Sequence, residues 1–149
     1  MIKKTSKDIL VLSFLLVFLT VILIFYYKLS NKKEIQIITD KNEYLAGEPL
    51  KIKIKNQTKK EICFSSCYPY YLERKEKEWK AYSYDACPYK DKAVYCLKPR
   101  LVKAFQISIP SKVIEKGIHR LAIPVCLNCQ PNNDFKQEKW FYSNKFIIN

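Results

Sequence analysis

The segment Leu50-Lys51-Ile52-Lys53-Ile54-Lys55 decides the fold class, because apolar and charged residues alternate along it without interruption. Successive side chains of a β-strand point to opposite faces, so a period of two predicts a strand with one face in a core and the other in water. The same alternation returns in residues 105–109, before Pro110, and in residues 121–125. These segments predict a domain built from strands.

Further strands are expected at residues 35–39, 68–73, 79–84 and 142–148. Residues 74–78 form a charged turn between two of them. Pro124 predicts an edge position or a bulge, because proline cannot donate to a β-ladder. No segment beyond residue 33 has a sustained helical stripe, so we expect an all-β, antiparallel sandwich of about seven strands.

An apolar run precedes this domain, from Ile9 to Tyr27, with only Ser13 and Thr20 as polar interruptions. As a helix, the run would be about 29 Å long, which matches the ~30 Å hydrocarbon core of a bilayer. We therefore expect four parts in chain order. They are a cytoplasmic tail at residues 1–8, a transmembrane signal anchor at 9–27, a linker at 28–33 and one domain at 34–149.

A cleaved signal peptide is the alternative for residues 9–27, because Lys3, Lys4 and Lys7 form a charged region ahead of the run. The run is longer than the apolar core of about 7–15 residues that is usual for a signal peptide, and no small-x-small cleavage site follows it. An uncleaved anchor is therefore favoured. Lysines lie on both sides of the run, so charge alone does not set its orientation.

Six cysteines follow the anchor, at Cys63, Cys67, Cys87, Cys96, Cys126 and Cys129. An even count at this density is typical of an oxidising compartment. We therefore place the domain outside the cytoplasm, in a periplasm or at a cell surface, and expect a disulfide framework. The expected pairing joins Cys87 to Cys96 and bridges the first two cysteines to the last two.

Two other roles are open for the cysteines. Cys63, Cys67, Cys126 and Cys129 could supply four thiolates to a zinc ion. The motif from Cys126 to Cys129 could instead exchange disulfides, but a reactive motif of this kind sits at a helix N-terminus, and here Gln130-Pro131-Asn132-Asn133 follows. Structural disulfides are favoured over both.

The charge is strongly positive, at +13 for the chain, of which residues 1–33 carry six lysines and one aspartate and leave +8 for the domain. Basic and acidic residues are interspersed, and no basic helix stands out. A basic surface alone attracts any anion and does not select one. We expect no nucleic-acid partner, no small-molecule substrate and no cofactor.

The clustered tyrosines are the candidate interaction surface, because exposed tyrosines give a large contact area at low entropic cost. They are Tyr68, Tyr70, Tyr71, Tyr82, Tyr84 and Tyr89. His119, the only histidine, is expected to be solvated or half-buried rather than a general base. Asp40, Glu43 and Glu48 could bind calcium through their oxygens, although turn and strand-edge positions explain them as well.

Residues 39–49, Thr-Asp-Lys-Asn-Glu-Tyr-Leu-Ala-Gly-Glu-Pro, are followed by alternating isoleucines and then by Asn56. This pattern resembles the opening of the bacterial immunoglobulin-like domains found on lipoproteins and surface proteins. Tyr71-x-Glu73 with Trp79 is similar to the central hairpin of that family. Gly117-x-x-Arg120-Leu121 is similar to the turn that enters its penultimate strand, and Tyr142-Ser143-Asn144-x-Phe146-x-Ile148 to its last strand.

The resemblance covers most of residues 35–149 and implies a sandwich of immunoglobulin type, not an activity. The chain departs from the family in its dense cysteines and in having only two glycines, Gly47 and Gly117. Tight two-residue hairpins, whose turn geometry favours glycine, are therefore in doubt.

These features predict a membrane-anchored, extracytoplasmic, non-catalytic immunoglobulin-like domain that mediates protein-protein or cell-envelope interactions. Its expected partners are the membrane, through residues 9–27, and a protein or envelope component. Inhibition of a protease by a sandwich loop is the alternative binding function. A thiol-redox or zinc-binding protein follows behind both.

Overall fold

The computed structural model describes residues 6–30, 34–83, 85–108 and 114–149, and the chain divides into two compact units, Met1–Lys33 and Glu34–Asn149. The first unit contains the helix α1, Ser6–Ser30. Side chains of α1 are described at residue 11 and at residues 13–26, and the large apolar ones among them are each at least half exposed. Within the described residues, no helix combines the length and the hydropathy needed to cross a membrane.

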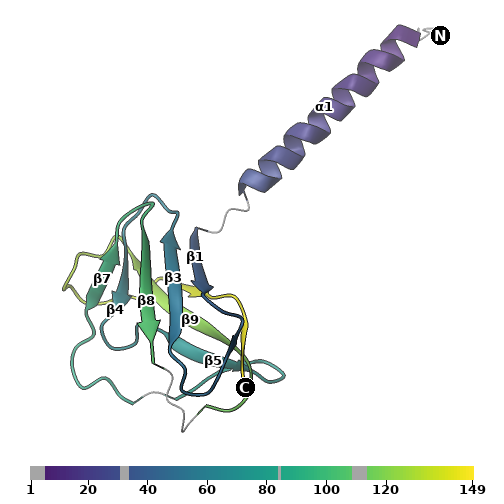
Figure 1. Cartoon of the computed structure of the whole chain (residues 1–149). Helices are drawn as coiled ribbons and strands as arrows, with labels where there is room; N and C mark the ends of the chain where they lie inside the picture. The colour runs from purple at the N-terminus through teal and green to yellow at the C-terminus, as the bar shows by residue number, and fades with distance from the viewer. Residues whose placement is uncertain (1–5, 31–33, 84, 109–113) are drawn as a thin grey trace. The chain divides into compact units, whose positions relative to one another are not determined.

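The second unit is built from strands (Figure 1). In chain order they are β1 Ile35–Thr39, β2 Glu43–Tyr44, β3 Leu50–Asn56, β4 Ile62–Ser65, β5 Tyr71–Lys75, β6 Trp79–Ala81, β7 Ala93–Leu97, β8 Val102–Ile107, β9 Gly117–Leu127, β10 Lys139–Tyr142 and β11 Phe146–Ile148. The chain is thus mostly β with one helix.

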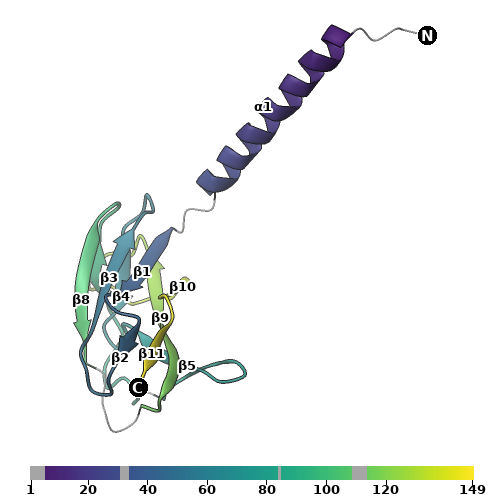
Figure 2. The same ribbon diagram turned by 45° about the vertical axis from the view of Figure 1, so that its right-hand side comes forward.

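The strands form two sheets. β1, β3 and β8 make a three-stranded sheet with β3 in the middle. The larger sheet is organised around β9, which pairs with β11 and β10 along one edge and with β5 and β4 along the other. β2, β6 and β7 extend this sheet from β11, β5 and β4 respectively. Figure 2 shows β8 and β3 on one side of the unit and β9 and β10 on the other.

Pairing is antiparallel except between β2 and β11, which run parallel. The expectation of purely antiparallel pairing is therefore wrong at this pair. The chain leaves the three-stranded sheet after β1 and joins the larger sheet beside the last strand. Asn144 fixes that crossing, because its Oδ1 accepts from Thr39 N at 2.8 Å and its Nδ2 donates to Thr39 Oγ1 at 2.7 Å.

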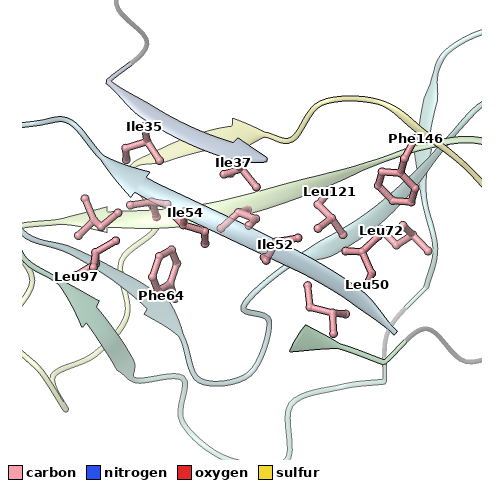
Figure 3. Packing of buried hydrophobic residues seen from close by; sticks show 14 of the residues in the cluster. Ile35, Ile37, Leu50, Ile52, Ile54, Phe64, Leu72, Leu97, Leu121 and Phe146 are labelled. Atoms are coloured by element: carbon pink, nitrogen blue, oxygen red, sulfur yellow. The ribbon is translucent and has the colours of Figure 1, made fainter. Parts of the chain in front are cut away.

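The inward residues of both sheets share one core, in which side chains from β1 and β3 meet those from β4, β5, β7, β9 and β11 (Figure 3). Leu50, Ile52 and Ile54 of β3 are no more than 4% exposed, as their alternation with lysines predicts. Burying one such side chain contributes about 1.5–3 kcal/mol. Period-two patterning thus accounts for the layering of the unit.

Several strands match the sequence expectation. β1 has the expected bounds, and β3 and β9 contain their alternating segments. β8 contains residues 105–107 of the expected 105–109, residue 108 follows the strand, and residue 109 lies outside the described residues. β5 and β6 cover residues 71–75 and 79–81 in place of the expected 68–73 and 79–84. The single strand expected at 142–148 is wrong, because the chain there ends β10 and begins β11.

The two-residue strand β2 and the strands β4 and β7 were not predicted from the sequence. All four residues of β4 are buried, so no apolar and polar alternation marks it. β7 contains a bulge, because Ile62 pairs with Leu97 and Phe64 with Val94, which leaves two β7 residues opposite Cys63. The bulged residue Tyr95 has a φ of 50°, and the bulge breaks the period that a regular strand would show.

Pro124 lies in β9, the central strand of the larger sheet, so the expected edge strand or bulge is wrong, although β10 alone pairs with β9 at this residue. Leu121 O and Val125 O accept from Ser143 N and Glu138 N, so odd-numbered residues of β9 bond toward β10. The nitrogen of Pro124 therefore points toward the other edge. There β5 pairs only as far as Ala122 and β4 begins at Val125, so no ladder bond is lost.

Candidate interaction site

The outer face of the larger sheet carries the most prominent cluster of side chains in the described domain. Leu121, Ile123 and Val125 face the core, so the even-numbered residues of β9 face outward. The neighbouring strands add aromatic residues at matching register positions, with Tyr71 and Tyr142 opposite Ala122. We name the set Tyr68, Tyr71, Trp79, Arg120, Trp140 and Tyr142 the outer aromatic face.

One part of this face is a row of aromatic rings. The Tyr68 and Tyr71 rings stack with centroids 5.7 Å apart, and the Tyr71 and Trp140 rings meet edge to face at 5.4 Å. The row covers the outward surface of β9, where Ala122 is only 2% exposed and Pro124 is buried. Such ring pairs contribute about 0.5–1.5 kcal/mol beyond their buried area.

The other part is centred on Arg120. Its guanidinium carbon lies 4.2 Å from the centroid of the Trp79 ring and 3.9 Å from that of the Tyr142 ring. Arg120 Nε also donates to Glu73 Oε2 at 2.6 Å. Stacking and pairing hold the arginine in place, because its planar group interacts with ring faces and carboxylates at once.

The face is ordered yet open to solvent. Trp140 remains 39% exposed and Tyr142 44% exposed. Rigid, partly exposed aromatic and arginine side chains are the residue types that dominate binding energy at protein interfaces. The arrangement can therefore bind another surface at low entropic cost.

The structure separates the tyrosines that the sequence analysis grouped together. Tyr68 and Tyr71 belong to the outer aromatic face, whereas Tyr70 lines a cavity beside the core. Tyr82 stacks on His119, and Tyr89 is 62% exposed in the loop before β7. Tyr84 lies outside the described residues.

Four members of the outer aromatic face were not predicted: Trp79, Arg120, Trp140 and Tyr142. Their common signal is position on the outward register of neighbouring strands. Reading that signal requires knowing that β10 and β5 flank β9, and strand order does not follow from the local sequence pattern.

The six cysteines lie in three pairs at disulfide distance, Cys63–Cys96, Cys67–Cys87 and Cys126–Cys129. The predicted framework is present, but the expected bridge from Cys87 to Cys96 is wrong, and so are the bridges between the first and last clusters. Cys63 and Cys96 meet because β4 and β7 are neighbouring strands.

Hydrogen bonds in the turn after β4 and in the loop before β7 hold Cys67 and Cys87 close together. The Asp91 carboxylate accepts from Cys67 N at 3.2 Å and from Ser66 N at 3.0 Å, which fixes the turn after β4. The Tyr68 hydroxyl accepts from Cys87 N at 2.6 Å, so the loop that carries Cys87 is held against the same turn.

The four cysteines considered as zinc ligands are not brought together, because Cys63 and Cys67 have separate partners. Among the described residues, the group of possible metal ligands that does converge is Cys126, Cys129 and Glu138, whose ligand atoms lie within 4.8 Å of one another. Within it, the two sulfurs are paired with each other. Cys126 lies near the end of β9, and Cys129 follows the strand through a bend, not a helix, with Asn128 at a φ of 57°.

Two of the three acidic residues considered for calcium, Asp40 and Glu48, are engaged elsewhere, and Glu43 is exposed on β2. Asp40 accepts from the Tyr44 hydroxyl at 2.6 Å, and this bond lowers the pKa of the carboxyl group. Burial, with Asp40 close by, raises the pKa of Tyr44 to about 12. Glu48 pairs with Lys41 and accepts from Leu45 N at 3.0 Å. These contacts build the corner between β1 and β3.

His119 is fully buried, so the expectation of a solvated or half-buried side chain is wrong. Its Nε2 is 3.1 Å from the Tyr82 hydroxyl and its Nδ1 is 2.9 Å from Gly117 O. Its ring stacks between those of Tyr82 and Phe146. Burial lowers its pKa, which favours the neutral imidazole.

Comparison with known proteins gives little. No family model matches the chain, and no curated protein matches it. One solved structure with a partial match is the alkylpurine DNA glycosylase AlkC of Pseudomonas fluorescens bound to DNA containing an abasic site analog, at 12% identity and a TM-score of 0.37. The match covers 79% of this chain and 31% of that one. A similarity of this size supports no conclusion about this chain.

Proposed function

We propose that this chain is a membrane-anchored, non-catalytic binding protein whose domain lies outside the cytoplasm and engages a protein or cell-envelope partner. The observation that carries the proposal is the outer aromatic face. Its tryptophans, tyrosines and arginine are fixed by mutual contacts while Trp140 and Tyr142 stay substantially exposed. Order without burial is what a preformed binding surface requires.

An immunoglobulin-like sandwich is part of the proposal. Two sheets on one core, a central β3 in one and a central β9 in the other support it. The corner after β1 supports it as well. There the Tyr44 hydroxyl is bonded to Asp40, and Gly47 adopts the positive φ of a turn before β3. Gly47 has a φ of 86°, a conformation that glycine adopts without strain.

The anchor rests on the composition of residues 9–27. Exposed apolar side chains all around a helix are unfavourable in water and favourable in lipid. We propose that residues 1–8 are cytoplasmic, and the paired cysteines favour an oxidising compartment for the domain. The natural protein should therefore stay in the membrane after an alkaline wash and retain residues 9–27. A mature form that begins after residue 27 would contradict the anchor.

Site-specific photo-crosslinking in the source cells tests the binding face. A photoreactive amino acid replaces Trp140 in the full chain, and the matched control replaces Ile38, which is 40% exposed on the outer face of the three-stranded sheet. We expect one dominant adduct from position 140 and none of that mass from position 38. Equal adducts from both positions, or none from position 140, would refute the assignment of this face.

A further inference from the structure

A second feature of the domain lies away from the outer aromatic face, at the edge of β8. β8 pairs with β3 on one side, and its other edge pairs with no strand among the described residues. Asn56 N donates to Leu101 O, so the odd-numbered residues of β8 bond toward β3. The N–H and C=O groups of Val102, Ala104 and Gln106 therefore point outward, and we name these three residues the open edge.

A cavity of about 250 Å³ lies beside this edge, between the two sheets. Its walls are apolar and come from both layers, with Phe105 and Ile107 on β8 facing Phe64, Tyr70 and Tyr95. The Phe64 and Phe105 rings meet edge to face at 6.0 Å across it. Tyr95, 64% exposed, stands at its rim.

We propose that the open edge accepts an extended segment of a partner protein as an added strand of the three-stranded sheet. Main-chain bonds to residues 102, 104 and 106 would supply affinity, as in other cases of strand addition to a sheet edge. The side chain of the segment that lies beside Phe105 points inward and enters the cavity. At about 250 Å³, the cavity is below the usual 300–1,000 Å³ of a small-molecule site and suits one or two apolar side chains.

The charges around the open edge indicate which residues the outward face of the partner segment should carry. Outward positions of the added strand lie beside Ala104 and Gln106, whose register partners on β3 are Lys53 and Lys51. Both lysines are exposed, and Ala104 is too small to cover Lys53. Lys103 lies on the inward face, with its Nζ 5.5 Å from the Tyr95 ring centroid and 5.3 Å from that of Phe105. No ion pair involves these lysines among the described residues.

The partner segment should therefore alternate apolar residues, facing inward, with acidic residues, facing outward. A second copy of this chain fits poorly, because pairing β8 with β8 would bring lysines together and join two domains of charge +8. A basic edge has another use, since lysines on edge strands discourage non-specific strand pairing. If the lysines recognise a partner, peptides that alternate apolar and acidic residues should bind. If the lysines only protect the edge, no peptide should be enriched.

The experiment is selection from a displayed library of random peptides of about eight residues against the full chain in lipid nanodiscs. We expect enriched peptides to alternate apolar and acidic residues. In the Ala104→Pro variant, which loses one outward N–H but no bond to β3, enriched peptides should bind at least about tenfold more weakly. Ala104→Ser keeps the N–H and should bind within about twofold.

A second variant keeps the proposal testable if Ala104→Pro fails to fold. Lys53→Glu should shift selection from acidic toward basic residues at the outward positions, because Lys53 is the register partner of Ala104 and the substitution reverses the charge beside the added strand. The Trp140→Ala variant should retain selected peptides, so this test fails or succeeds separately from the proposed binding face. Absence of enrichment, enrichment without alternation, or unchanged binding to both Ala104→Pro and Lys53→Glu would overturn the proposal.

Discussion

The two sheets share one core, but their outer faces carry different kinds of side chain. The three-stranded sheet turns Lys51, Lys53 and Lys55 outward from β3, whereas the larger sheet turns aromatic rings and Arg120 outward from β9 and its neighbours. All three cysteine pairs also belong to the larger sheet and its loops. The difference indicates that the smaller sheet depends mainly on apolar alternation, while the larger one adds cysteine pairs and a row of ring contacts on its outer face.

The cysteine pairs of the larger sheet should contribute most to its stability. Replacing Cys63 and Cys96 together by alanine removes a bridge between residues 33 apart in sequence. On the chain-entropy model, the free energy of unfolding should fall by about 4 kcal/mol. The matched control replaces Cys126 and Cys129, which are 3 apart, and should cost about 2 kcal/mol. Urea denaturation measures both, and a larger loss from the second pair would contradict the ranking.

In the smaller sheet, inward apolar residues should contribute far more to the free energy of unfolding than outward lysines. Ile54→Ala should lower the free energy of unfolding by about 3 kcal/mol, because Ile54 is 2% exposed in the core. Lys53→Ala, one residue away on the outward face, should change it by less than about 0.5 kcal/mol. Similar losses from the two substitutions in urea denaturation would mean that the outward face is also packed.

A third prediction concerns the junction between the sheets. Asn56, at the end of β3, is 1% exposed, and its Nδ2 donates to Leu97 O of β7 at 3.0 Å and to Lys60 O at 2.8 Å. Asn56→Ala would remove the buried bond to Leu97 O, whereas Lys60 O keeps the bond from Thr58 Oγ1, and should cost about 2 kcal/mol. Thr58→Ala, which removes the hydroxyl bonded to Asn56 Oδ1, should cost less because Thr58 is only half-buried. The thermal midpoints of the two variants rank them.

The same comparison explains what the sequence could predict. In the smaller sheet, β1 and β3 each have one face in the core and one in water, so their periods are visible in the chain. In the larger sheet, β4 is buried throughout and β7 bulges at Tyr95, so neither shows a period. The Cys63–Cys96 pair depends on those two strands being neighbours, so the partner of Cys96 was predicted wrongly.

The candidate sites follow the same rule. Tyr68 and Tyr71 were predicted as surface residues because they lie close together in the sequence, and the structure does bring them together. Trp140 is about 70 residues away from Tyr71, and only the pairing of both strands with β9 places their rings in contact. Patterns within one strand can be predicted from local sequence, whereas a surface shared by three strands requires their order.

His119 gives the inner face of the larger sheet a buried titratable side chain, which should make the stability of the domain depend weakly on pH. Burial lowers the pKa of His119 below its usual 6.5, so the unfolded chain takes up a proton before the folded one does. The free energy of unfolding should therefore hold above pH 6.5 and decline below it, by at most about 1.4 kcal/mol per pH unit. Hydrogen-bonded carboxylates such as Asp40 and Asp134 have lowered pKa values, so their contributions are lost only at still lower pH.

Because His119 is the only histidine, its NMR titration isolates the effect, and His119→Gln should flatten the stability profile between pH 6.5 and 5.5. A His119 pKa at or above 6.5 in the folded protein would contradict the expected effect of burying the ring between those of Tyr82 and Phe146.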